Sequence, residues 1–336
     1  MLQPFNSSNL KFPCIVYGLD RSVATMATPR KVNFVSRGIN VVGNLFIPPA
    51  SSSVPDRKKA AIVVGHQGTG VKEQAAGLYA ETFASQGFVT LAFDAAYQGE
   101  SDGTPRGLED PSQRVEDIKS AVTYLSTLGA DRVDPGRIGV VGVCASGGYS
   151  ICAAATDPRI KAVAGVSPMC FGTLTRDGMK DPETGRLDLA KLSQALAAAA
   201  QFRIHEAEGK PPVTHNILDI FSHPREDIKG YYSNPRWNNP RCTNNMLTRS
   251  VELLATFDAF QYIEWVSPRP LLLIAGDEAM TYPYIVEASE RALEPKELFI
   301  VKGRGHVDLY QDVSESGPKL ADFMATALCG VGSALA

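Results

Sequence analysis

Residues 137–149 read RIGVVGVCASGGY, and the rest of the chain is arranged around this stretch. Its first half is a continuous run of apolar residues and glycines, which is typical of a strand buried on both faces of a parallel sheet. Small residues then lie on both sides of Cys144, and a small-residue helix is predicted at 149–155. A sharp turn between such a strand and helix is a nucleophile elbow, which raises one side chain above the sheet edge at a helix N-terminus. The stretch therefore predicts a catalytic site.

Strands and helices alternate on both sides of this stretch. An antiparallel pair is predicted at 31–37 and 39–47, and further strands at 60–65, 88–93, 138–142, 160–166, 270–276 and 297–301. The intervening helices are predicted at 72–86, 112–128, 283–293 and 312–328. This alternation predicts an α/β fold with a doubly wound, mostly parallel sheet.

The alternation stops after the strand at 160–166 and resumes only near residue 270. Helices are expected in this interval at 187–201 and 242–261. Insertions at the carboxyl ends of parallel strands lie where ligands bind in such sheets. We therefore predict an α/β core of residues 26–169 and 267–336, a helical lid insertion at 170–266, and an N-terminal tail at 1–25.

Composition narrows the function classes. The 336 residues include 33 basic and 36 acidic side chains, and a net charge of −3 provides no basic surface for nucleic acid or anionic lipid. The six cysteines show no CxxC spacing, which favours free thiols over disulfides or a zinc site. We expect a cytoplasmic protein with no membrane span, no nucleic-acid partner and no metal or organic cofactor. The sequence leaves open whether residues 1–25 are a targeting leader.

Acyl transfer through an elbow needs a base, an acid that orients the base, and backbone amides for the oxyanion. The predicted base is His306, on a glycine-flanked loop after the last strand, and the predicted acid is Asp277, with Glu278 as the alternate. The order nucleophile, acid, histidine along the chain is that of α/β-hydrolases. This order predicts a catalytic triad.

The oxyanion donors are expected from two loops. One amide should come from the residue after the nucleophile, and the other from the loop after the first long parallel strand. We therefore predict Ala145 together with Gln67 or Gly68.

Two residues compete for the role of nucleophile. The strand at 138–142 already has an ordinary length, which places Cys144 at the apex of the turn. A turn two residues later would make Ser146 the nucleophile, but it would put a cysteine in a crowded position suited to glycine. Cys144 is favoured, and Ser146 is kept as the alternate.

Several motifs resemble a known family. They are the elbow with its cysteine, the loop DAAYQGESDG at 94–103, the helix start RVED at 114–117 and the ending HVDLY at 306–310. Together they resemble the dienelactone-hydrolase-like branch of the α/β-hydrolases, and within it the fungal polyketide transferase and thiohydrolase group. The likeness runs from about Met26 to the C-terminal helix.

This resemblance implies an α/β-hydrolase fold, Cys144 as nucleophile, His306 as base and an acid on the 277–278 loop. The chain departs from the family pattern at two positions. Ala279 stands where many relatives place the triad aspartate, and Ser146 replaces the second glycine of the elbow.

Three functions are consistent with these residues. The first is an acyl hydrolase or acyltransferase that acts on a thioester or ester, such as a polyketide acyl group, through a covalent acyl-enzyme. The second is a general carboxylesterase or lactone hydrolase that uses Ser146. The third is a non-catalytic binding or pathway-assembly protein with a degenerate triad. The expected partner is a small-molecule acyl substrate, free or bound to a carrier protein, and the sequence leaves open whether the chain forms a homodimer.

Overall fold

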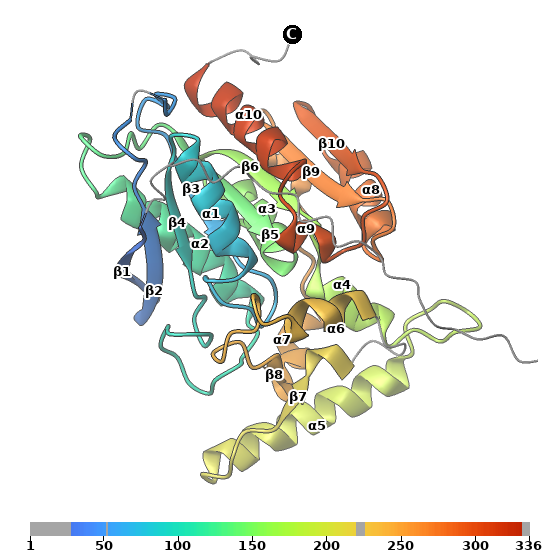
Figure 1. The fold of residues 1–336 in the computed structure, drawn as a ribbon. Helices are drawn as coiled ribbons and strands as arrows, with labels where there is room; N and C mark the ends of the chain where they lie inside the picture. The colour runs from blue at the N-terminus through green and yellow to red at the C-terminus, as the bar shows by residue number, and fades with distance from the viewer. Residues whose placement is uncertain (1–27, 52, 220–225, 331–336) are drawn as a thin grey trace, which may run out of the picture.

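A single eight-stranded sheet forms the centre of the protein (Figure 1). The computed structural model describes residues 28–51, 53–219 and 226–330, so the predicted N-terminal tail at 1–25 lies outside the described residues. The strand order is β1-β2-β4-β3-β5-β6-β9-β10. The strands are β1 (Arg30–Ser36), β2 (Ile39–Phe46), β3 (Ala61–Gly65), β4 (Val89–Phe93), β5 (Ile138–Val143), β6 (Ile160–Val166), β9 (Leu271–Gly276) and β10 (Lys296–Val301).

Strand direction follows the sequence pattern. β1 and β2 pair antiparallel, β2 pairs antiparallel with β4, and all later pairings are parallel. Every residue of β3, β4, β5 and β9 is buried, because helices cover both faces of the parallel strands. The predicted doubly wound, mostly parallel sheet is confirmed.

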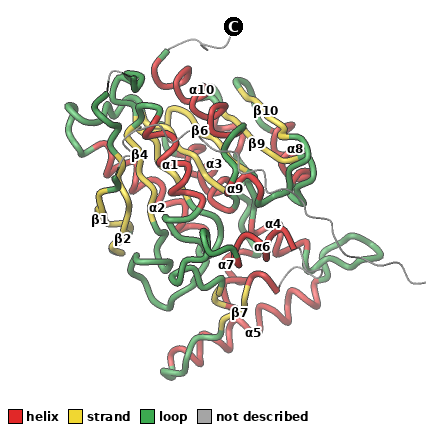
Figure 2. Tube along the Cα trace, in the orientation of Figure 1, coloured by secondary structure: helices red, strands yellow, loops and turns green. Residues whose placement is uncertain are grey.

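Helices form a layer on each face of the sheet (Figure 2). α1 (Ala75–Ser85) packs with α9 (Asp308–Gln311) and α10 (Ser316–Cys329) on one face. α2 (Pro111–Ser126) packs with α3 (Ala145–Thr156) on the other face, and α8 (Tyr282–Arg291) packs against β9 and β10. The N-terminus of α2 is fixed by Asp110, whose carboxylate accepts from the amides of Ser112 and Gln113.

An insertion between β6 and β9 gathers at one end of the sheet (Figure 1). It contains α4 (Phe171–Asp177), α5 (Leu189–Ala207), β7 (Thr214–Asn216), η1 (Ile217–Asp219), α6 (Glu226–Ser233), β8 (Asn245–Leu247), η2 (Thr248–Ser250), α7 (Val251–Leu254) and η3 (Ile263–Val266). α5 lies outermost, and Ala199 is its one buried residue. Except for η3, which packs on α3 and leads into the start of β9, these elements lie at the carboxyl ends of the parallel strands.

One expected helix of the insertion is wrong. Instead of one helix, the segment 242–261 forms a short strand, β8, followed by η2, α7 and turns. β8 pairs antiparallel with β7, and Asn244 just before it has a φ of 55°, which a helix does not tolerate. The other expected helix exists, and it is longer and displaced, as α5.

Candidate active site

Cys144 lies at the apex of the turn between β5 and α3. Its φ of 56° and ψ of −119° are a strained combination for a residue with a side chain, of the kind that costs on the order of 1–3 kcal/mol and is kept at functional sites. The amide of Cys144 donates to the carbonyl of Val166 at 2.9 Å, which fixes the turn to the neighbouring strand. Gly142 makes the turn feasible, because a Cβ there would lie 2.0 Å from the carbonyl oxygen of Ser146. The strained residue of the elbow is thus the cysteine.

Ser146 faces away from this apex, into the protein beneath the elbow. Its hydroxyl donates to the carbonyl of His66 at 2.5 Å and accepts from the guanidinium of Arg114 at 3.1 Å. Room for its side chain comes from Gly65 on β3, where a Cβ would lie 2.7 Å from the Cβ of Ser146. The departure from the usual second elbow glycine is therefore matched by a glycine on the adjacent strand.

His306 follows β10 and is buried beside the elbow. Its Nδ1 lies 2.8 Å from the hydroxyl of Thr281, and its Nε2 lies 2.8 Å from the hydroxyl of Tyr310. The backbone carbonyl of His306 accepts from the hydroxyl of Ser167 at 3.0 Å, which anchors the loop to the end of β6. The hydroxyl of Tyr310 also lies beside the sulfur of Cys144, where it lowers the pKa of the thiol.

Neither predicted acid is the group that hydrogen-bonds Nδ1 of His306 at 2.8 Å. Asp277 accepts from the amide of Gly303 at 2.7 Å and pairs with Lys302 at 3.4 Å. Burial alone would raise the pKa of Asp277, but the Gly303 amide and Lys302 lower it overall. The side chain of Glu278 is exposed. At Nδ1 of His306, the position that the acid of a triad occupies, the structure places the hydroxyl of Thr281.

Two amides converge on the sulfur of Cys144. They belong to Ala145, at the start of α3, and Gly68, on the loop after β3. Gly68 has no room for a side chain, because a Cβ there would lie 2.1 Å from the ring of Phe171. The side chain of Gln67 turns away and donates to the side-chain carbonyl of Gln74 at 3.0 Å. Of the predicted oxyanion donors, the structure brings Ala145 and Gly68 to the sulfur of Cys144.

The thiol of Cys144 is held neutral at rest. Burial raises its pKa above the ordinary value, although the Tyr310 hydroxyl and the amides of Gly68 and Ala145 act in the opposite direction. The resting site therefore differs from a preformed thiolate and imidazolium pair, which would require a lowered thiol pKa.

A cavity of about 360 Å³ opens onto Cys144 and His306. Most of its wall is apolar and comes from the insertion, from the loop after β6 and from the loop that carries His306. The apolar lining side chains are Met169, Phe171, Leu174, Met179, Ala195, Ala198, Ile217, Leu218, Ile228, Met246, Val251, Leu254, Met280 and Val307. Thr175, His215 and Thr248 supply polar groups from the insertion. The cavity suits an apolar group attached to a carbonyl that reaches the elbow.

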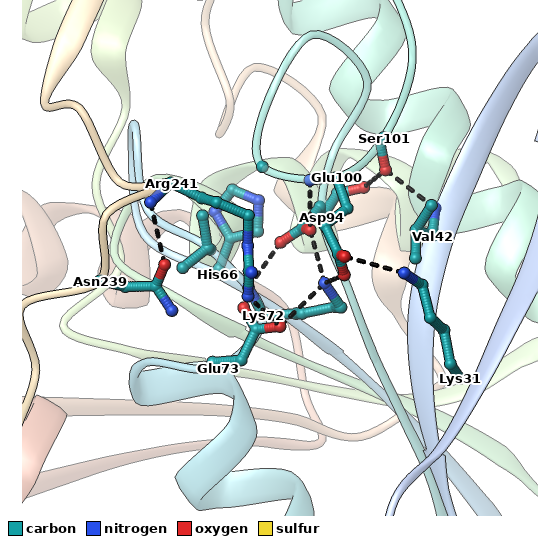
Figure 3. A network of polar contacts seen from close by, with 12 residues as sticks. Lys31, Val42, His66, Lys72, Glu73, Asp94, Glu100, Ser101, Asn239 and Arg241 are labelled. Atoms are coloured by element: carbon teal, nitrogen blue, oxygen red, sulfur yellow. Dashed lines mark hydrogen bonds and ion pairs between the residues drawn. The ribbon is translucent and has the colours of Figure 1, made fainter.

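A buried charge network supports the loop that carries Gly68 (Figure 3). Lys72 lies 2.7 Å from Asp94, 2.7 Å from Glu100 and 2.9 Å from Glu73. Burial alone would lower the pKa of Lys72, but these carboxylates raise it overall. Arg241 of the insertion pairs with Glu73 at 2.8 Å, so the network also connects the insertion to the loop.

Sequence reasoning missed two residues of this site, Thr281 and Tyr310. Tyr310 follows His306 by four residues, close to one helical turn, and this spacing was the available signal. No pattern in the sequence marks Thr281.

Among residues 28–51, 53–219 and 226–330, no group of three or more His, Cys, Asp or Glu side chains is placed to hold a metal ion. Within the same ranges, no helix has the length and apolar character needed to cross a membrane.

Known proteins similar to this chain include two from bacteria. The chain is 38% identical to the uncharacterized protein PA2218 of Pseudomonas aeruginosa over 296 residues, which cover 84% of this chain and 76% of that protein. It is 36% identical to the uncharacterized protein YcjY of Escherichia coli over 310 residues, covering 89% of this chain and 99% of that protein. The crystal structure of PA2218 superposes with a TM-score of 0.81 and covers 91% of this chain and 95% of that one.

Fungal relatives are also similar. The acyltransferase drtE of Aspergillus calidoustus is 30% identical over 242 residues, which cover 71% of this chain and 76% of that protein. Further fungal relatives are named polyketide transferase and thiohydrolase. The predicted resemblance to this group is confirmed, and the relatives named as hydrolases and acyltransferases support enzyme activity. The family model described as "Alpha/beta hydrolase family" matches residues 62–316, so the chain belongs to the α/β-hydrolase family.

Proposed function

We propose that this protein is a cysteine-dependent acyl hydrolase or acyltransferase that acts on thioesters or esters with an apolar acyl group. The observation that carries the proposal is the position of Cys144. It lies at a strained elbow, its sulfur contacts the amides of Gly68 and Ala145, and it faces an apolar cavity. Covalent catalysis needs such a nucleophile next to amides that can receive an oxyanion.

The reaction would proceed through an acyl-enzyme. The sulfur of Cys144 attacks the substrate carbonyl as its proton passes to His306, and the new oxyanion accepts hydrogen bonds from the amides of Gly68 and Ala145. The carbon–leaving-group bond then breaks, and His306 returns the proton to the departing thiol or alcohol. Water or an acceptor hydroxyl attacks the thioester on Cys144, gives its proton to His306 and releases the acyl product with the sulfur protonated again.

Thr281 would orient the histidine in this scheme. When Nδ1 of His306 carries a proton, it can donate to the hydroxyl of Thr281 at 2.8 Å and leave Nε2 as the base. A hydroxyl fixes the tautomer and the ring orientation as a carboxylate does, but it does not neutralise an imidazolium.

The acyl group is proposed from the cavity and from the relatives. The wall is apolar and the relatives include proteins named acyltransferase, polyketide transferase and thiohydrolase. A polyketide-type acyl chain, free or delivered as a carrier-protein thioester, fits this description.

The test is formation of a covalent adduct on Cys144. The protein is mixed with an octanoyl thioester or with p-nitrophenyl octanoate, and its intact mass is measured within one turnover. We expect an added octanoyl group on Cys144, which is lost in Cys144→Ala and strongly slowed in His306→Ala. Ser146→Ala should form the adduct as the unmodified protein does.

Two results would support other functions. An adduct that persists in Cys144→Ala and disappears in Ser146→Ala would favour a serine carboxylesterase or lactone hydrolase. Binding of octanoate or octanoyl thioester without any adduct or turnover would favour a binding protein.

A further inference from the structure

Tyr310 connects the nucleophile to the histidine. Its hydroxyl lies 2.8 Å from Nε2 of His306, the nitrogen that takes the proton of the nucleophile in a triad. The same hydroxyl lies beside the sulfur of Cys144 and lowers the pKa of its thiol, and all three side chains line the apolar cavity. Tyr310 is only 2% exposed, so bulk water does not compete for these contacts.

The ring of Tyr310 is held in place by residues of the insertion. It meets the ring of Tyr231 edge to face at 5.3 Å, and Tyr231 stacks on Trp237 at 5.8 Å. The indole N–H of Trp237 donates to the side chain of Gln311, the residue after Tyr310, at 3.1 Å. Such packing on two sides opposes rotation of the phenol away from Cys144.

The hydrogen bonds can all run in one direction when the site is neutral. The thiol of Cys144 donates to the oxygen of Tyr310, the hydroxyl of Tyr310 donates to Nε2 of His306, and Nδ1–H donates to Thr281. Cys144, Tyr310 and His306 then each have a proton to give and an acceptor for it. This order is also what a proton transfer from sulfur to imidazole requires.

We infer that Tyr310 is a catalytic residue that carries the proton between Cys144 and His306 during acylation and deacylation; this inference rests on the proposed acyl-transfer function. As the sulfur attacks, its proton moves to the oxygen of Tyr310 while the proton of Tyr310 moves to Nε2. One S–H and one O–H bond break, and one O–H and one N–H bond form. Tyr310 is neutral before and after, and His306 becomes an imidazolium.

A tyrosinate is not part of this step. Burial and the neighbouring sulfur of Cys144 hold the pKa of Tyr310 well above its ordinary value, so the phenol gains one proton as it loses the other. After acylation, an acceptor hydroxyl in the cavity would deliver its proton to His306 through the same oxygen.

The test compares Tyr310→Phe with the unmodified protein in the rate of octanoyl transfer from p-nitrophenyl octanoate to Cys144. The variant keeps the ring and its packing and removes one oxygen. We expect acylation to slow at least about 100-fold, the lower end of what proton transfer by a positioned group contributes, with little change in KM. Tyr124→Phe is the matched control, because Tyr124 stacks on Phe34 at the β1 edge of the sheet and its loss of a hydroxyl should leave the rate unchanged.

A measurement on the unmodified protein makes the test independent of how the variant folds. Acylation is followed in mixtures of H₂O and D₂O, where two protons moving in one step give a curved dependence of rate on deuterium fraction. A straight line, or acylation of Tyr310→Phe at the unmodified rate or faster, would overturn the relay and leave the acyl-enzyme proposal intact. If the unmodified protein forms no octanoyl-Cys144 at all, the proposed function and the relay fail together.

Discussion

The hydroxyl of Thr281 at Nδ1 of His306 gives a sharp prediction about which residue supports the histidine. Thr281→Val keeps the shape of a fully buried side chain and removes its oxygen. The buried N–H of the imidazole then lacks this acceptor, which costs about 1–3 kcal/mol. If that cost appears in the transition state, kcat for octanoyl transfer falls roughly 5- to 150-fold, at 1.4 kcal/mol for each factor of ten.

The two carboxylates near Thr281 in the sequence serve as controls. Asp277 pairs with an 83%-exposed Lys302, and exposed pairs contribute about 0–1 kcal/mol. We therefore expect Asp277→Asn and Glu278→Gln to change kcat by no more than a few fold. A true triad carboxylate is worth about 10⁴ in kcat. A fall of that size in Asp277→Asn, with Thr281→Val unaffected, would refute the assignment of Thr281 and restore Asp277 as the acid.

Three other predictions concern the elbow and its support. The rate of iodoacetamide alkylation of Cys144, measured by peptide mass spectrometry, should rise with pH around a midpoint above that of free cysteine, because burial raises the thiol pKa. A midpoint below that of N-acetylcysteine would contradict this prediction. Lys72→Met should lower the free energy of unfolding, measured in urea, by about 3–5 kcal/mol because Asp94 loses its buried partner. Lys31→Met, at the exposed end of the network, should lower it by less than about 1 kcal/mol. Equal losses in the two variants would count against a buried ion pair. Gly65→Ala should lower the free energy of unfolding by about 1–3 kcal/mol, because the new methyl group meets Ser146. In the double variant, Ser146→Gly should recover much of that loss. If thermal unfolding shows that the losses of the two single variants simply add, the two positions are not coupled.

The core of this fold is readable from sequence because its signals are local. Continuous apolar runs mark strands covered on both faces, and the structure has them at β3, β4, β5, β6 and β9. The elbow is equally local: the small residues around Cys144 and the length of the preceding strand set the turn. The insertion has no comparable local pattern. The prediction of a helix at 242–261 is wrong because β8 forms by pairing with β7, about thirty residues earlier in the chain.

The contacts of His306 are harder to read, since each depends on segments that meet only in the folded chain. Thr281 reaches Nδ1 across 25 residues of sequence, from the start of α8. A search for a carboxylate on that loop selects Asp277 and Glu278, the acids present, because sequence order cannot distinguish a side chain that turns toward the histidine from one that turns toward Gly303. Hydroxyl groups are too common in sequences to mark a site by themselves.

The raised pKa of the Cys144 thiol bears on the kind of substrate that the site suits. A hydroxyl lies at Nδ1 of His306 and a phenol at Nε2, and the raised thiol pKa keeps the proton on the sulfur of Cys144 before substrate binds. Charge develops only when the carbonyl is attacked, and the amides of Gly68 and Ala145 are the groups placed to receive it. A good leaving group can depart without first being protonated by the histidine. A thiolate is such a group, because a thiol is a far stronger acid than an alcohol. We therefore propose that the site prefers thioesters and activated esters to alkyl esters, in keeping with the apolar lining of the cavity.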